Sequence, residues 1–228
     1  MSRTSAASAV TRWSRWGVAL VEAGDGRPLC LSLTNTRFFR NSTAPRETLR
    51  GYADLVDWAS LKKIVGPKEA NRLVGQSTAS PPAARRELAR TIALREAMAR
   101  LFAAKAHHRE LAADDLAVVM ATFNEAAKQL KLAIDDERIV PCLDDARAGL
   151  ALPRWQAAVS AIGLLTSKAA ARVKECADDR GCGWLFLDTT RNGSRVYCFS
   201  SECGNRARQM KFRERHRAGD GTVHVHRA

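Results

Sequence analysis

The chain has 228 residues, and its hydrophobic content of 46% suffices for a folded core, which excludes a disordered chain. Its net charge of +13 favours a polyanionic partner such as nucleic acid, although 28 of the 37 basic residues are arginine and a compositional bias would also raise the charge. No apolar run approaches the roughly 20 residues of a membrane span, and the run at 17–21 is too short for a signal peptide, so a cytoplasmic protein without a membrane segment is expected.

The first two thirds of the sequence are typical of a mostly helical domain. Two short strands are expected at 17–21 and 29–33, because a glycine-containing turn separates two apolar runs. Helices follow where apolar residues recur at helical spacing, with Pro45 and Pro81 at two of the expected starts. These helices are expected at residues 45–65, 68–75, 81–105 and 115–130.

The periodicity then changes from helical to alternating. Leu130, Leu132 and Ile134 alternate with polar or small residues and an Asp-Asp turn follows, so a hairpin is expected over 130–140. A last helix is expected to begin at Pro153 and to carry the chain to Cys176. The predicted fold class is therefore mainly α with small β-hairpins, an α+β protein.

Four cysteines near the C-terminus have the spacing of a metal site. Five residues separate Cys176 from Cys182, fifteen lie between the two pairs, and four separate Cys198 from Cys203. Two close pairs in a chain whose thiols stay reduced favour one structural Zn²⁺ over disulfides, and four thiolates leave no open position for catalysis.

Between the two cysteine pairs the sequence predicts a hairpin. Residues 184–187 are expected as one strand, Asn192-Gly193 as the turn, and 195–197 as the return strand. A helix is expected after Cys203, so the module resembles a treble clef. The segment at 204–217 carries six basic residues and one acidic residue, a net charge of +5, which favours contact with phosphates over a merely solvated face.

Two sequence patterns resemble a known family. Residues 182–188 (Cys-Gly-Trp-Leu-Phe-Leu-Asp), 190–192 and 203–206 (Cys-Gly-Asn-Arg) are similar to the CGNR zinc-finger signature. Upstream, residues 31–36 and 52–58 resemble the ABATE domain that usually precedes this finger. The resemblance implies a bacterial regulator of transcription, often described as stress-induced. It implies the ligand role for the four cysteines and marks Asn205 and Arg206 as motif residues. We expect residues 12–170 to form the helical domain and 171–218 the zinc finger.

The predicted function is a zinc-dependent, DNA-binding transcriptional regulator whose N-terminal domain senses a small-molecule effector or forms a homodimer. Double-stranded DNA is the expected partner. The residues expected to contact it are Arg191, Arg195, Asn205, Arg206, Arg208, Lys211, Arg213, Arg215 and Arg217. The alternative is a protein-interaction scaffold whose zinc module docks an acidic partner.

Two polar residues after the second expected strand are candidates for a ligand pocket. Two roles are open for Asn35 and Thr36: they complete the turn after the strand, or they line a pocket and orient a small ligand. The sequence contains no Gly-rich phosphate loop, no Gly-x-Ser-x-Gly and no His-Glu-x-x-His, so no enzyme is expected. An enzyme with a site near Asn35 remains the third hypothesis.

Overall fold

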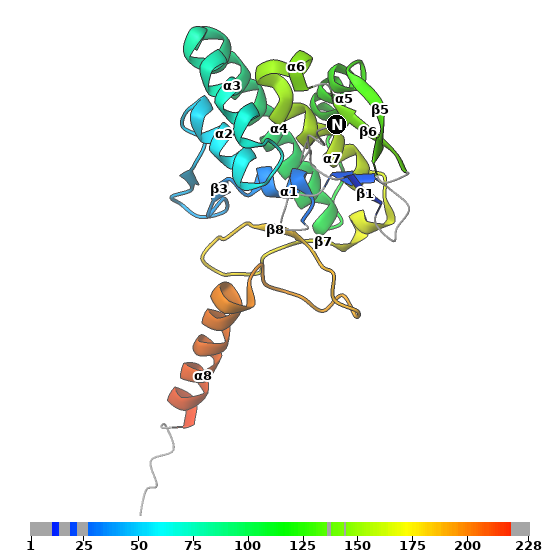
Figure 1. The fold of residues 1–228 in the computed structure, drawn as a ribbon. Helices are drawn as coiled ribbons and strands as arrows, with labels where there is room; N and C mark the ends of the chain where they lie inside the picture. Colours follow the sequence, from blue (N-terminus) through cyan, green and yellow to red (C-terminus); the bar gives the residue numbers. More distant parts are fainter. Residues whose placement is uncertain (1–10, 14–18, 22–26, 136–137, 144, 220–228) are drawn as a thin grey trace, which may run out of the picture.

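The computed structural model describes residues 11–13, 19–21, 27–135, 138–143 and 145–219. Figure 1 shows a helical body, a small module beneath it, and a last helix that projects away from both. The first expected strand, at 17–21, lies in part outside the described residues. No helix in the described ranges is long and apolar enough to cross a membrane.

The helices of the body are joined by short connections. They are α1 (Leu29–Thr34), α2 (Tyr52–Leu61), α3 (Pro67–Ala79), α4 (Pro81–Ala106), α5 (Ala113–Ala127), α6 (Asp145–Ala148), α7 (Leu152–Leu165) and the 3-10 turns η1 (Gly149–Ala151) and η2 (Lys168–Arg172). The module adds the π-helical turn η3 (Ser200–Gly204) and the projecting helix α8 (Asn205–Gly219).

The strands form two-stranded antiparallel pairs. These are β1 (Thr11–Trp13) with β2 (Ala19–Val21), β3 (Arg37–Phe38) with β4 (Arg46–Glu47), β5 (Leu130–Asp135) with β6 (Arg138–Leu143), and β7 (Val173–Glu175) with β8 (Leu185–Leu187). Mostly helical structure with small antiparallel pairs confirms the predicted fold class, and the hairpin expected at 130–140 is present as β5 and β6.

The long helix α4 forms the centre of the core. Its Leu94, Met98, Leu101 and Phe102, which share one face at helical spacing, are at most 1% exposed. Helices α1, α2, α3, α5 and α7 pack around it. The same helix also carries a buried charge, because Arg95 is 1% exposed and its guanidinium contacts Glu47 on β4 at 2.6 Å.

Two expectations for the first part of the chain were wrong. Residues 29–33 form helix α1 rather than a strand. A short apolar run does not distinguish a strand from a buried helix, and Leu29, Cys30 and Leu33 are all fully buried between α4 and α7. Residues 46–47 pair as strand β4, so the helix expected from Pro45 begins instead at Tyr52.

The expected hairpin between the cysteine pairs was also wrong. Strand β8 pairs with the upstream strand β7, with Glu175 opposite Leu185. The segment expected as the return strand lies elsewhere, since the carbonyl of Val196 accepts a hydrogen bond from the amide of Ala177. The chain thus enters the module through β7 and not directly from the last helix of the body, because α7 ends at Leu165.

Candidate metal centre and basic helix

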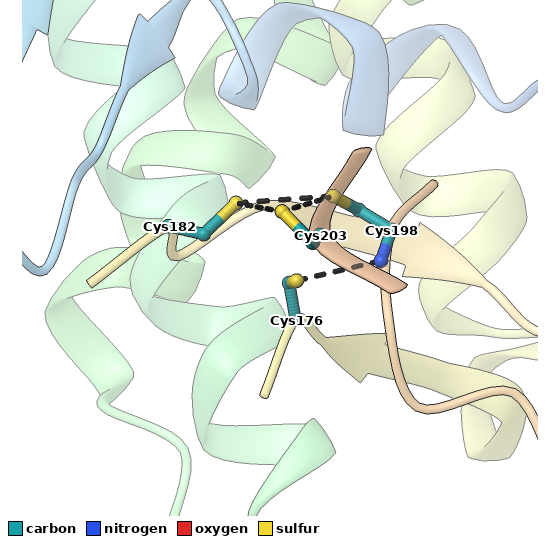
Figure 2. Close-up of side chains that lie close together, drawn as sticks. All are labelled: Cys176, Cys182, Cys198 and Cys203. Atoms are coloured by element: carbon teal, nitrogen blue, oxygen red, sulfur yellow. Dashed lines mark hydrogen bonds between the residues drawn. The ribbon is translucent and has the colours of Figure 1, made fainter. Parts of the chain in front are cut away.

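The four cysteine side chains converge on one point between β7, β8 and η3 (Figure 2). Their sulfur atoms all lie within 4.8 Å of one another, and each residue is at most 7% exposed. The Sγ atom of Cys198 lies 3.8 Å from that of Cys182 and 3.6 Å from that of Cys203. The sulfur atoms of Cys203 and Cys182 are 3.9 Å apart.

These separations fit a zinc ion. Zinc–sulfur bonds of about 2.3 Å in a tetrahedron place the sulfur atoms about 3.8 Å apart, which the three distances match to within a few tenths of an ångström. All four cysteines are free thiols. The centre therefore holds one structural zinc ion, and its four thiolates fill the coordination shell.

The thiols also influence one another's protonation. Hydrogen bonds from Cys182 and Cys198 lower the pKa of the Cys176 thiol, whereas donating to Cys176 raises the pKa of Cys182. Thiolates this close repel one another, so they ionise together only when a cation shares their charge. Zinc binding must therefore release protons from the four thiols, and the zinc affinity must fall at acidic pH.

The backbone and one arginine support the sulfur atoms from outside. The amide of Cys198 donates to Sγ of Cys176 at 3.4 Å. Arg206 places Nη2 2.6 Å from a carboxylate oxygen of Asp178 and 3.4 Å from Sγ of Cys203. The hydrogen bond with Asp178 and, to a lesser degree, that with Cys203 raise the pKa of Arg206. The structure thus places this motif arginine against the metal centre, although the sequence indicated a contact with nucleic acid.

A buried aspartate organises the loop that follows β8. Asp188 is fully buried, and its carboxylate accepts hydrogen bonds from the amides of Thr190 and Arg195. The ammonium of Lys174 lies 2.8 Å from the same carboxylate, and together these donors lower the pKa of Asp188. The expected turn at Asn192 is present, since the amide of Gly193 donates to the carbonyl of Thr190. The return strand is missing because the Asp188 side chain, and not the backbone of β8, accepts the hydrogen bond from the amide of Arg195.

That loop presents its two arginines differently. Arg191 is exposed at the tip. Arg195 folds back instead, because its guanidinium lies 4.5 Å from the ring centroid of Phe186 and its Nε donates to the carbonyl of Tyr197. Of the two residues expected to contact nucleic acid here, only Arg191 extends into solvent.

The first zinc knuckle packs tightly against the body. The amides of Arg40 and Asn41 donate to the carbonyls of Cys182 and Gly181. Gly181 has φ +76°, and a Cβ atom there would lie 2.5 Å from the amide nitrogen of Ser42. Only glycine allows both this positive φ and such a close approach to the backbone of Ser42. Gly181, next to the ligand Cys182, therefore lets the zinc knuckle pack directly on the body.

Asn35 makes a second connection between the body and the module. Its side-chain amide donates to the carbonyl of Leu185 at 2.8 Å and accepts from the amide of Leu185 at 3.0 Å. The side chain thus pairs with the edge of β8 that faces away from β7. Thr36 is buried beside it, where its hydroxyl donates to the carbonyl of Leu33 and accepts from Arg95.

A cavity of about 250 Å³ lies along this contact between body and module. Its lining combines cationic and aromatic side chains from both parts. They include Arg27, Leu31, Asn35, Lys62, Trp184 and Arg195. A neighbouring hollow is lined by Thr36 and shares Asn35 and Lys62 with the first.

Helix α8 projects into solvent beyond the metal centre (Figure 1). Every side chain from Arg208 to His216 is exposed. In the described part of the chain, neither Lys211 nor Arg213 forms a salt bridge, and the same holds for Arg208 and Arg215, which contact backbone carbonyls. Asn205 is the exposed first residue of the helix, whereas the side chain of Arg217 lies outside the described residues.

Family models match both parts of the chain. The model described as "Putative stress-induced transcription regulator", ABATE, matches residues 27–168. The model described as CGNR zinc finger matches residues 172–216. These matches confirm the expected families and their order. No curated protein matches the chain.

Proposed function

The chain belongs to the ABATE family and carries a CGNR zinc finger, and from this premise we propose that it is a DNA-binding transcriptional regulator. Residues 12–170 form the sensor or dimerisation domain, and residues 171–218 form the DNA-binding module. The observation that carries the proposal is α8, an exposed helix with six basic residues and one acidic residue that starts directly at the metal centre. Phosphates are the partners that such a surface attracts most strongly.

The exposure of the basic side chains reduces the number of residues expected to contact DNA. Arg208, Lys211, Arg213 and Arg215 are exposed on α8, and Arg191 is exposed on the loop that follows β8. Arg206 and Arg195 contact groups of the module itself and contribute to its shape. We therefore assign phosphate contact to the exposed group and a supporting role to the inward pair.

Salt dependence tests this assignment. Fluorescence anisotropy with a labelled duplex should give a log–log slope of about −0.9 for each phosphate neutralised. The variant Lys211→Ala/Arg215→Ala should lower the affinity for every duplex and make the slope shallower by about two. The matched control is Arg85→Ala/Arg86→Ala, which removes two exposed charges from α4 and should leave affinity nearly unchanged.

Two results would contradict the proposal. If the control lowered affinity as much as the α8 variant, net charge rather than α8 would be responsible. If no duplex bound and an acidic protein co-purified in stoichiometric amount, the module would be a protein-docking scaffold.

The sensor role is assigned to the cavity beside Asn35. Arg27, Lys62 and Arg195 line it together with the indole of Trp184, a combination that suits a small anion with an aromatic body. Benzoate at millimolar concentration should raise the melting temperature of the protein, and benzyl alcohol should not. The benzoate effect should disappear in Lys62→Ala; an unchanged melting temperature of the wild type would count against this site.

A further inference from the structure

One side of helix α8 carries no lysine or arginine. Asn205, Gln209, Phe212 and His216 follow one another at spacings of four, three and four residues, which places them along one side of the helix. The rings of Phe212 and His216 confirm the shared face, since their centroids are 4.0 Å apart. All four side chains are exposed, Phe212 by 56%.

Basic positions border this face on both sides. At about 100° per residue, Arg208, Lys211 and Arg215 fall along one border. The positions of Arg213 and Arg217 fall along the other border. Arg206 would also belong to the second border by position, but its guanidinium is held by Asp178. The helix surface thus has two cationic borders with a nearly uncharged strip between them.

We propose that this strip reads base edges in the major groove of double-stranded DNA while the two borders contact the phosphates of opposite strands. The inference rests on the proposed function and adds the residues that give sequence specificity. A helix of about 10–12 Å diameter fits a groove about 12 Å wide. Glutamine and asparagine make paired hydrogen bonds with adenine, and an apolar ring contacts the methyl group of thymine.

The remaining surface of α8 fits a protein partner less well. The side opposite the strip carries Ala207, Met210 and Glu214, so no continuous apolar stripe is available for packing against another helix. The helix has 15 residues and is about 22 Å long, less than one turn of DNA at about 34 Å. One protein molecule would therefore contact the bases of less than one turn of DNA through α8.

Selection from a pool of randomised duplexes tests the proposal. The wild type should enrich a defined motif, and anisotropy should show a preference for that motif over a scrambled duplex. In Gln209→Ala/His216→Ala this preference should fall by at least about tenfold, because the paired hydrogen bonds of Gln209 and the ring-nitrogen contact of His216 with the bases are lost. Affinity for the scrambled duplex should change by less than about twofold, because the phosphate contacts remain.

Two control variants separate this inference from the proposed function. Lys211→Ala/Arg215→Ala should weaken binding to the motif and to the scrambled duplex alike, with the preference intact. Met210→Ala, on the opposite side of the helix, should alter neither. Duplex binding by the wild type without enrichment of any motif, or an unchanged preference in Gln209→Ala/His216→Ala, overturns the reading face and leaves the proposed function standing. Failure of the wild type to bind any duplex overturns both.

Discussion

Arg206 lies between two negative groups, the carboxylate of Asp178 and the Cys203 sulfur. A zinc ion with four thiolates carries a net charge of about −2, so a fixed guanidinium beside one sulfur stabilises the filled centre. Residues that orient metal ligands in this way contribute to metal affinity without touching the ion. The position of Arg206 therefore predicts a loss of zinc affinity on substitution, separate from any effect of α8 on DNA.

Replacing Arg206 with alanine should lower zinc affinity by about 10- to 100-fold, because Cys203 loses a donor and Asp178 loses its closest cation. Competition with a chromophoric chelator measures the zinc affinity, which follows from the chelator concentration at which zinc leaves the protein. Arg206→Lys should recover only part of the affinity, since an ammonium does not reproduce the planar set of donors.

Arg208→Ala is the matched control, because it removes an arginine two positions further along the same helix, whose guanidinium donates to the carbonyl of Ser200. Its zinc affinity should equal that of the wild type. If Arg206→Ala retained zinc as well as this control but lost DNA affinity, Arg206 would be a DNA contact, as the sequence alone indicated.

Some helices, and the metal centre, could be predicted from sequence patterns within a single segment. The apolar residues at helical spacing over 81–105 predicted helix α4, and Leu94, Met98 and Phe102 of that spacing are buried, because helical periodicity is a property of neighbouring residues. The cysteine spacing predicted the metal centre, and the uniform charge after Cys203 predicted an exposed helix. Each of these inferences required only residues of the same segment.

Other elements depend on contacts between distant segments, and no local pattern contains them. Strand β8 pairs with β7, while the side chain of Asn35 occupies its other edge and the side chain of Asp188 takes the amide of Arg195 from the expected return strand. Asn35 lies 150 positions before Leu185 in the sequence. For the same reason the sequence suggested a turn or a ligand site for Asn35 and did not reveal its pairing with β8.

At the scale of the whole molecule, the metal centre joins two parts of very different stability. The body has a continuous core around α4 that also includes Val173 and Leu185 of β7 and β8. The module has only a small cluster of its own in the described residues, formed by its four cysteines and Phe186, with Trp184, Tyr197 and Phe199 partly buried against it. So few apolar groups cannot order this segment alone, so zinc must contribute most of its folding free energy.

Removing zinc with a strong chelator should therefore abolish DNA binding while most of the helical circular dichroism signal at 222 nm remains. The retained signal should come from α1–α7, whose core does not include the four metal-binding cysteines. Lowering the pH should have the same effect as chelation, because thiolates must be protonated as the metal leaves, so zinc is held at neutral pH and lost towards acid. Inductively coupled plasma measurements on the dialysed protein give the zinc content, and anisotropy gives the affinity.

The double variant Cys198→Ser/Cys203→Ser separates loss of metal from side effects of the chelator. It should bind no zinc, keep the helical signal of the body, and lose at least about tenfold in DNA affinity, because α8 begins two residues beyond Cys203 and its side chains from Arg208 to His216 are exposed. Unchanged DNA affinity in this variant would mean that α8 finds DNA without the centre, in the manner of a free basic peptide. Loss of the whole helical signal would mean instead that the contacts of Asn35 and Gly181 with the body make both parts fold as one cooperative unit.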